Sequence, residues 1–288
     1  MMITGCRGQV GHCLVSQLTG KAELLALDFQ QLDITNQHAV NDTVESFNPD
    51  YIVNAAAHTA VDKAEEEVDA SYAVNCDGPR FLAEAASKYN AVMMHISTDY
   101  VFDGEGDNAY CESDLTAPIG IYGKSKLAGE EAVAHACERH IILRTAWVFG
   151  QHGNNFVKTM LRLGSERDKL SIVGDQFGGP TYAGDIASAL IRIMDQVELR
   201  KDIEWGVYHF SGMPYVSWYE FAQEIFSVAE KQGVLKSPVL SSIPTSAYPT
   251  PAKRPANSRL DCRKIEQVFN VLPSNWKEAL KQIEEYRI

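Results

Sequence analysis

The chain has 288 residues, of which 45% are hydrophobic and 22% are charged, and this composition excludes an intrinsically disordered chain. Its formal net charge of −12 argues against a general binder of nucleic acid or of anionic membranes. The six cysteines are scattered without a Cys-x-x-Cys pair, so we predict neither a disulfide framework nor a zinc site.

The first residues are not those of a signal peptide, because Met1 runs straight into Gly5 without a charged segment and a long apolar stretch. No window approaches the roughly 18 uncharged apolar residues that a membrane-spanning helix needs. We therefore expect a cytoplasmic protein with no membrane partner.

Apolar runs rich in β-branched residues alternate with segments of helical periodicity as far as Gly150. The predicted strands are Met1–Thr4, Glu23–Asp28, Tyr51–Ala57, Val92–Thr98 and Ile141–Val148. The predicted helices between them are Gly8–Leu18, Thr35–Phe47, Ser71–Tyr89 and Ile119–Glu138. Such alternation predicts a parallel sheet with right-handed crossovers, in which ligands bind at the carboxyl ends of the strands.

After Gly150 the pattern is less regular. Helices are predicted at Asn155–Leu163, Asp185–Met194, Ser217–Lys231, Arg263–Phe269 and Ser274–Tyr286, and short strands at Leu170–Val173 and Val207–Phe210. We expect this region to form a smaller lobe over the edge of the sheet.

A glycine loop, Gly5–Gly11, follows the first strand and opens the first helix. Glycines at the spacing Gly-x-x-Gly-x-x-Gly let the backbone approach a pyrophosphate, and the amides of the helix N-terminus complement its charge. An ordinary glycine turn is the structural alternative. The residues that we expect to bind a cofactor here are Gly5, Arg7, Gly8, Gln9, Val10 and Gly11.

Asp28 ends the second predicted strand, where a carboxylate accepts hydrogen bonds from the adenosine ribose and repels a 2′-phosphate. This favours NADH, but Arg7 could pair with that phosphate, so the choice between NADH and NADPH stays open. Asp33 and Ile34 are placed to contact the adenine. A plain turn residue is the structural alternative for Asp28.

Small residues follow the third predicted strand and let the chain pass close beneath a cofactor. Ala57, His58 and Thr59 are expected to line the cofactor path through their backbone. For the His58 side chain we favour a structural role, because a lone histidine is more often structural than catalytic.

Tyr122 and Lys126 stand at i and i+4 in a predicted helix, so their side chains share one face. A free phenol has a pKa of about 10, and a neighbouring ammonium lowers that pKa and can hold a ribose hydroxyl. An exposed surface pair is the alternative. Thr98 closes the fourth predicted strand, where it can share a substrate oxygen with Tyr122. Together, the three side chains predict a carbonyl reduction.

With these motifs the chain resembles the extended short-chain dehydrogenase/reductases, whose Ser97–Phe102 and Tyr122-x-x-x-Lys126 patterns it carries. Longer strings are similar to the dTDP-4-dehydrorhamnose reductase family. They are Asn54–Glu65, Arg144–Val148, Asn154–Met160, Asp175–Pro180, Tyr248–Pro255 and Asn257–Leu260.

The resemblance implies reduction of the C4 keto group of dTDP-4-dehydro-L-rhamnose by NADPH or NADH, the last step of dTDP-L-rhamnose synthesis. It implies that Tyr122 protonates the developing alkoxide, and that Lys126 lowers the pKa of Tyr122 and binds the nicotinamide ribose. It further implies that Thr98 tunes the shared hydrogen bond.

The substrate is expected to be a small nucleotide sugar. Trp147 matches the family position that packs on the sugar, with a core aromatic as the alternative, and Asn155 is the candidate for the diphosphate. The stretch Lys253–Lys264 holds five basic residues and one acid and could also meet the diphosphate, with a solvated loop as the alternative. The substrate-side candidates are Thr98, Asp99, Trp147, Asn155, Arg254 and Arg259.

The predicted fold is α/β, a Rossmann-like doubly wound parallel sheet with a smaller α/β substrate-binding lobe. We predict an NAD(P)-binding domain of residues 1–148 with roughly 183–210, and a sugar-nucleotide lobe of 149–182 with 211–288. Relatives have been linked to Mg²⁺ and to dimers. His12 and Cys13 stand where some relatives carry a carboxylate, so we predict no metal site and leave a homodimer open.

Two other functions remain alternatives. An epimerase or dehydratase of the same fold retains NAD⁺, but Tyr100 replaces the glutamate with which related dehydratases eliminate water. A regulatory subunit of the methionine adenosyltransferase type binds the cofactor without turnover, and has no need of an intact set of Thr98, Tyr122 and Lys126.

Overall fold

The computed structural model describes residues 1–200 and 202–287. Its main sheet has six strands, all parallel, in the order β10-β5-β4-β3-β1-β2. They are β1 (Met2–Thr4), β2 (Leu25–Leu27), β3 (Tyr51–Asn54), β4 (Val92–Thr98), β5 (His140–Thr145) and β10 (Gly206–His209). The chain runs from β1 outward to β2 and then returns to the other side of β1 as β3. This reversal opens a crevice at the carboxyl ends of β1 and β3.

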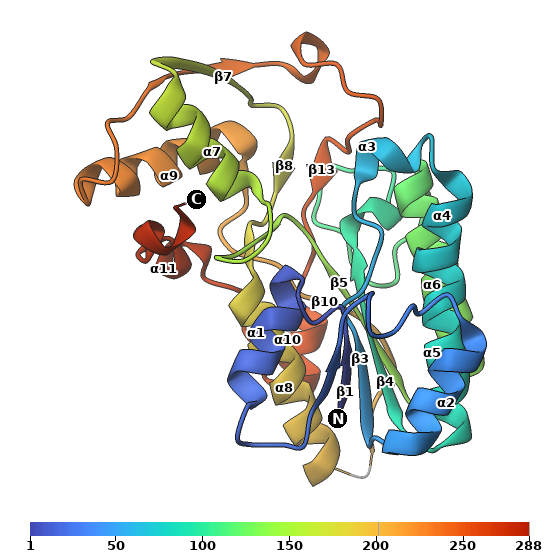
Figure 1. Ribbon diagram of the computed structural model, residues 1–288. Coiled ribbons are helices and arrows are strands. Elements are labelled where there is room, and N and C mark those ends of the chain that lie inside the picture. The colour runs from blue at the N-terminus through green and yellow to red at the C-terminus, as the bar shows by residue number, and fades with distance from the viewer. Residues whose placement is uncertain (201, 288) are drawn as a thin grey trace.

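Helices cover both faces of this sheet (Figure 1). One face carries α1 (Gln9–Leu18), α8 (Ala183–Leu199) and α10 (Arg263–Phe269), whose buried apolar residues share a core with β1, β4 and β5. The other face carries α2 (Gln37–Phe47), α5 (Gly78–Lys88) and α6 (Ile121–Ala136). The predicted fold class, a doubly wound α/β sheet, is therefore confirmed.

A smaller lobe lies over the carboxyl ends of the strands (Figure 1). It contains α7 (Phe156–Glu166), α9 (Trp218–Lys231) and α11 (Trp276–Leu280), with β7 (Lys169–Val173) paired to β12 (Val239–Ile243). Its short strands are β6 (Val148–Phe149), β8 (Phe177–Gly178), β9 (Thr181–Tyr182), β11 (Val216–Ser217) and β13 (Asn257–Ser258). Buried aromatic side chains, among them Phe149, Phe221 and Trp276, give this lobe a core of its own. The assignment of one part to the cofactor and the other to the sugar nucleotide stays a prediction.

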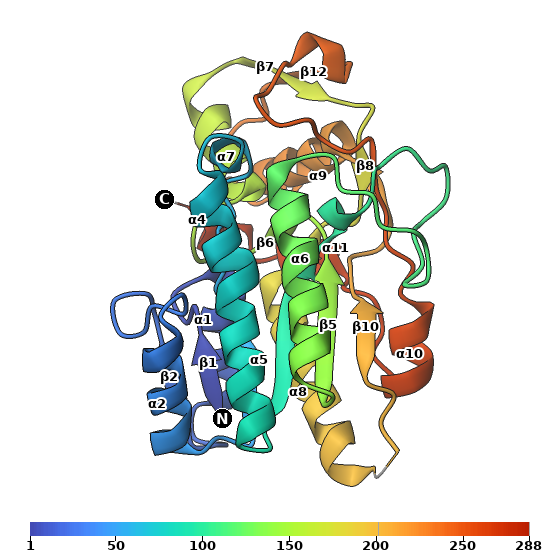
Figure 2. The same cartoon turned by 90° about the vertical axis from the view of Figure 1, so that its right-hand side faces the viewer.

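Three predicted elements are interrupted in the structure. The helix expected over Ser71–Tyr89 consists of α4 (Val68–Tyr72), a π-helical turn at Ala73–Asp77 and then α5; in Figure 2, α4, α5 and α6 lie along one face of the sheet. The strand expected over Ile141–Val148 breaks between β5 and β6, because Trp147 has a left-handed φ of 49° that ends the ladder. The C-terminal helix ends at Leu280, and a separate 3₁₀ turn follows at Ile283–Tyr286. The short helix α3 (Val61–Ala64) was not expected.

Within the described part of the chain, no helix is both long enough and apolar enough to cross a membrane.

Candidate active site

The glycine loop packs directly against the end of β3 and the start of α1. Gly5 has a φ of +70°, and a Cβ there would lie 2.6 Å from the Ala56 nitrogen. A Cβ on Gly11 would lie 2.2 Å from the Gly5 carbonyl oxygen. Neither position has room for a larger residue, so the glycines allow the N-terminus of α1 to approach the crevice closely.

A cleft of about 440 Å³ opens beside this loop. Eight predicted cofactor residues line it: Gly5, Arg7, Gly8, Asp28, Asp33, Ile34, Ala57 and His58. Phe29 and Leu32 also line it and were missed, because nothing in their residue type distinguishes them from ordinary apolar residues. Six predicted cofactor residues are not part of this lining, namely Gln9, Val10, Gly11, Thr59, Tyr122 and Lys126.

Arg7 and Asp28 form an ion pair at the mouth of the cleft. The Arg7 Nε atom lies 2.7 Å from one oxygen of the Asp28 carboxylate, and the other oxygen accepts hydrogen bonds from the amides of Gln30 and Gln31. Asp28 is buried, whereas the Arg7 side chain is 75% exposed. Arg7 would have to leave Asp28 to meet a 2′-phosphate. The ion pair therefore bears on the choice between NADH and NADPH.

Thr98 and Tyr122 come together at the end of β4, and Lys126 lies beneath the same strand end. The Thr98 hydroxyl donates to Asp99 at 3.0 Å and accepts from the Tyr100 amide at 3.2 Å. Loss of hydration raises the pKa of Tyr122 to about 12, although a hydrogen bond with Thr98 acts in the opposite direction.

Lys126 makes its hydrogen bonds in this structure with groups other than the Tyr122 phenol, so its predicted effect on the pKa of Tyr122 stays a prediction. The Lys126 side chain is buried, and its Nζ atom lies 2.7 Å from the Ile96 carbonyl oxygen and 3.2 Å from His95 Nε2. It is held beneath the strand end rather than bonded to the phenol. Desolvation also lowers the pKa of Lys126 itself to about 8.

Buried polar atoms without a partner gather where β4 and β5 end. Among the described residues they include Ser97 Oγ, one carboxylate oxygen of Asp99 and Thr145 Oγ1. Burial raises the pKa of Asp99 to about 6, while hydrogen bonds from Ser258 and Thr98 counteract the shift. Because unpaired buried polar groups are costly, this cluster is suited to the polar groups of a ligand.

Trp147 lies where the sheet meets the smaller lobe. Its indole stacks on Trp218, with ring centroids 3.5 Å apart and planes inclined by 10°. A Cβ on Gly178 would lie 2.6 Å from the Trp147 ring, so the glycine makes room for it. A left-handed φ is rare for a bulky residue, and such strain is found most often at functional sites. Trp218 was missed, since it is distant in sequence.

Arg254 reaches the site from the C-terminal region. Its Nη2 atom lies 2.6 Å from the Asp62 carboxylate, and its Nη1 atom is buried with no partner among the described residues. It also interacts with Tyr100, whose ring packs edge-on against Tyr122 at 5.3 Å between centroids. Asp62 and Tyr100 were not predicted to belong to the site.

Comparison with known proteins adds to this geometry. The family model described as the RmlD substrate binding domain matches residues 1–287. This chain belongs to the RmlD family.

RmlD relatives cover nearly the whole chain. A protein of Aggregatibacter actinomycetemcomitans named dTDP-4-dehydrorhamnose reductase is 52% identical over 99% of this chain and 98% of its own length. The crystal structure of a dTDP-4-dehydrorhamnose reductase from Clostridium acetobutylicum has a TM-score of 0.92 and 41% identity, covering 99% of this chain and 98% of that one. A dTDP-4-dehydrorhamnose reductase from Bacillus anthracis, solved in complex with NADP, has a TM-score of 0.90 and 38% identity, covering 98% and 97%. The predicted resemblance is thus confirmed.

Two residues that were predicted to bind the substrate already have hydrogen-bond partners within the protein. Asn155 caps helix α7 by accepting from the Lys158 amide, and it donates to Gln9 at 3.1 Å and to the Gly150 carbonyl oxygen at 2.7 Å. Arg259 donates to Asn257 and to the Asp107 carbonyl oxygen. Their predicted contact with a diphosphate would require exchange of these bonds.

The ring of His58 has partners within the protein, which is consistent with the structural role that we favoured. Its ring nitrogens lie 2.8 Å from Ser71 Oγ and 3.2 Å from a Glu67 carboxylate oxygen. Its backbone N–H and carbonyl oxygen both bond to the Asn75 side chain, which also donates to Ser125 beside Lys126. Asn75 therefore ties the wall of the cleft to helix α6. The sequence carried no signal for it.

No group of three or more His, Cys, Asp or Glu residues that could hold a metal ion occurs within residues 1–200 and 202–287. His12 instead stacks on His152, with ring centroids 3.5 Å apart.

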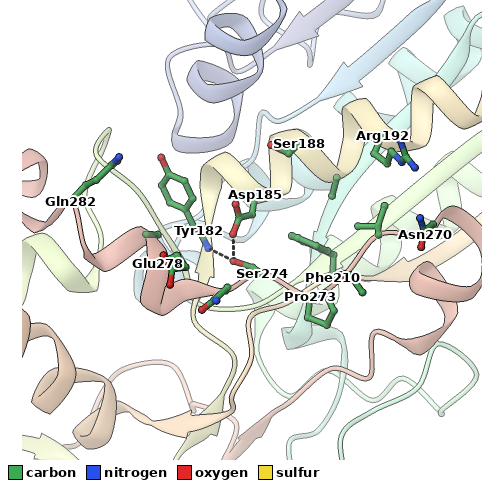
Figure 3. A pocket seen from close by; sticks show the side chains of 15 residues that line it. Tyr182, Asp185, Ser188, Arg192, Phe210, Asn270, Pro273, Ser274, Glu278 and Gln282 are labelled. Atoms are coloured by element: carbon green, nitrogen blue, oxygen red, sulfur yellow. Dashed lines mark hydrogen bonds between the residues drawn. The ribbon is translucent and has the colours of Figure 1, made fainter.

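A second cleft of about 590 Å³ lies away from the predicted site residues, along α8, the segment 270–275 and α11 (Figure 3). In it, Ser274 donates to Asp185 at 2.6 Å and accepts from the Tyr182 amide. None of the predicted site residues lines this cleft, so its size does not make it the candidate site.

Proposed function

We propose that this protein reduces the C4 keto group of dTDP-4-dehydro-L-rhamnose to dTDP-L-rhamnose, with NADPH or NADH as the hydride donor. Full-length relatives bear the name of this reductase, and one of them was solved with NADP. The observation that carries the proposal is that Thr98, Tyr122 and Lys126 lie at the same carboxyl edge of the sheet as the glycine loop.

The cleft suits the adenosine and pyrophosphate part of a dinucleotide. The space that a Cβ on Gly5 would fill is closed by backbone, and the start of α1 brings free amides to the crevice, which suits a pyrophosphate. Asp28 and Arg7 would meet the adenosine ribose or its 2′-phosphate, and Asp33 and Ile34 the adenine. When bound, the nicotinamide cofactor supplies a hydride to C4 of the sugar.

Tyr122 supplies the proton. With a pKa of about 12 its phenol keeps the proton at neutral pH, so it is ready to donate to the oxygen on which negative charge develops. The Thr98 hydroxyl would bond to the same substrate oxygen and orient it. Lys126 would hold the nicotinamide ribose.

The sugar nucleotide is proposed to lie between the strand ends and the smaller lobe. Trp147 offers an aromatic face to the sugar, and Asp99 an acceptor for its hydroxyls. Arg254, with a buried N–H group that has no partner among the described residues, is suited to the diphosphate. Asn155 and Arg259 are proposed to contact the same diphosphate. We also propose that the protein is cytoplasmic and is either a monomer or a homodimer.

The test supplies dTDP-4-dehydro-L-rhamnose and follows the loss of reduced nicotinamide absorbance with NADPH and with NADH. We expect turnover by the wild type and a loss of about 100-fold or more in Tyr122→Phe, as removal of a general acid should cause. Tyr100→Phe is the matched control, because it removes the neighbouring phenol and should cost less than about tenfold. Oxidation of neither cofactor would overturn the proposed reaction, and equal rates for wild type and Tyr122→Phe would overturn the role of Tyr122.

A further inference from the structure

The helix that carries Tyr122 begins at a residue that cannot cap it. Gly120 is the N-cap residue of α6 and has no side chain to accept a hydrogen bond. The first turn, residues 121–124, contains no acidic residue. The first amides of a helix find no acceptor within the helix, so they need one from elsewhere. Tyr122 is the second residue of α6 and lies in this turn.

Glu65 supplies an acceptor from a segment 56 residues earlier in the chain. Its Oε1 atom accepts a hydrogen bond from the Ile121 amide at 2.9 Å. Glu65 directly follows the short helix α3, whose last residue, Ala64, is completely buried. The carboxylate therefore reaches α6 from an anchored backbone. Its negative charge also suits a helix N-terminus, because it complements the helix dipole.

The glycine at position 120 leaves room for this carboxylate. A Cβ there would lie 2.7 Å from Glu65 Oε1. The backbone of Gly120 is extended, with a φ of −111° and a ψ of 170°, a conformation that any residue adopts. The backbone therefore does not require a glycine, whereas the Glu65 carboxylate does. Most helices are capped by a Ser, Thr, Asp or Asn at this position, and α6 is capped from another segment instead.

The first turn of α6 sets the position of the Tyr122 phenol. A Cβ on Gly123 would lie 2.1 Å from the Tyr100 carbonyl oxygen, so the helix begins in direct contact with the 3₁₀ turn that follows β4. Thr98, which bonds to Tyr122, is the last residue of β4. Fraying of this turn would move the phenol relative to Thr98.

We propose that Glu65 is a positioning residue for Tyr122, because its carboxylate caps α6 and so fixes the proton donor against Thr98. The inference rests on the proposed reduction and names a residue that acts on it through the helix. Helix α3 also carries Asp62, which binds Arg254 at 2.6 Å. The segment after the wall of the cofactor cleft thus positions a side chain on each side of the substrate.

The cap can be observed at a single amide of the full-length protein. The chain has one Gly-Ile pair, Gly120–Ile121, so labelling with ¹³C-carbonyl glycine and ¹⁵N-isoleucine selects the Ile121 amide. We expect this amide to exchange with solvent about fivefold faster in Glu65→Ala than in the wild type, as loss of a typical cap should cause. Glu66→Ala is the matched control, because the neighbouring glutamate is exposed, and should leave the rate unchanged. Equal rates in all three proteins would overturn the cap.

Turnover separates positioning from a contribution to stability alone. Glu65→Ala should lower kcat about tenfold and change KM for NADPH less than about twofold, since a displaced acid donates its proton more slowly. The solvent deuterium isotope effect on kcat should rise, because proton donation then limits the rate. Glu65→Gln keeps the acceptor oxygen and should stay within about threefold of wild type. An unchanged isotope effect, or an equal loss of kcat in Glu65→Gln, would overturn the positioning role.

A second substitution should restore the cap. In Glu65→Ala the space beside position 120 is free, and an aspartate there can cap α6 in the ordinary way. Glu65→Ala combined with Gly120→Asp should therefore recover kcat to within about threefold of wild type. Gly120→Asp alone sets two carboxylates against each other and should lose about tenfold.

A double variant no faster than Glu65→Ala would contradict the proposal. If Glu65→Ala does not fold, the kinetics of Glu65→Gln and of the double variant decide. Absence of reduction by the wild type would refute the proposed function, whereas exchange at the Ile121 amide would still show whether Glu65 caps α6.

Discussion

The glycine loop Gly5–Gly11 and the basic stretch Lys253–Lys264 are both proposed to bind an anionic ligand on a chain of net charge −12, but they offer different groups for it. The loop offers neutral backbone amides, held in place by packing so tight that a Cβ on Gly11 would lie 2.2 Å from another backbone atom. The basic stretch offers formal charge.

The positive charges of this stretch are largely paired with groups of the protein itself. Each cation of the stretch has a partner: Lys253 with Glu105, Arg254 with Asp62, Arg259 with the Asp107 carbonyl oxygen, Arg263 with Asp261 and Lys264 with Glu204. Of the five, Arg254 has a buried N–H group without a partner in the described part of the chain. Anion binding therefore depends on which donors are left over, and not on how many charges a segment carries.

The largest effect should come from breaking the loop. Gly11→Ala forces the backbone apart, and overpacking of about 1–3 kcal/mol corresponds to a loss of about 5–150-fold in NADPH affinity. Gly8→Ala is the matched control, since its Cβ would lie 3.2 Å from the Gly5 carbonyl oxygen and needs only a small shift. Calorimetric titration with NADPH measures both. Equal affinities for the two variants would show that tight packing is not what makes the loop bind.

A buried charge near the site should cost stability. The pKa of Asp99 rises from 3.8 to about 6 in the folded protein, so its contribution to stability is present below pH 3.8 and is lost as the pH rises through about 6. Asp99→Asn should therefore stabilise the protein by up to about 3 kcal/mol at pH 8 and change little near pH 4. Denaturant unfolding of both proteins at the two pH values measures this difference. A gain of the same size at both would mean that ionisation of Asp99 is not its cause.

The cations of the basic stretch should differ from one another. Arg254→Ala should raise KM for the sugar nucleotide about tenfold, because it removes the donor that is left over at the site. Arg263→Ala should change KM less than about twofold, because this side chain is 75% exposed and already paired with Asp261. Steady-state kinetics with saturating NADPH compares them. A tenfold rise in KM for the sugar nucleotide in Arg263→Ala would mean that the stretch binds the ligand as one basic patch.

The smallest effect concerns the choice of cofactor. Arg7→Ala should lower kcat/KM for NADPH about three- to fivefold and leave that for NADH nearly unchanged, since an exposed cation contributes little. The ratio of the two constants is the measurement. A ratio that does not move would mean that Arg7 stays with Asp28 and never meets a 2′-phosphate.

The sequence predicted the sheet and the loop well, because both depend on local pattern. The strand Val92–Thr98 has the predicted bounds, and the glycine spacing predicted where the chain comes close to itself. It failed where an element bends for a tertiary reason. The π-helical turn at Ala73–Asp77 carries Asn75, which binds the backbone of His58, and no periodicity announces such a contact.

By itself the sequence determined the fold class and the family, and it singled out Thr98, Tyr122 and Lys126 as candidates for the site. These follow from spacing along one chain, whether alternation of strands and helices or the i, i+4 position of Tyr122 and Lys126. Only the tertiary structure decided which atoms these side chains meet. It set Lys126 against His95 and Ile96 rather than Tyr122, and it paired the basic stretch with distant acids. Hydrogen bonds and ion pairs are made between segments far apart in sequence, so residue type shows that a partner is needed and folding alone selects it.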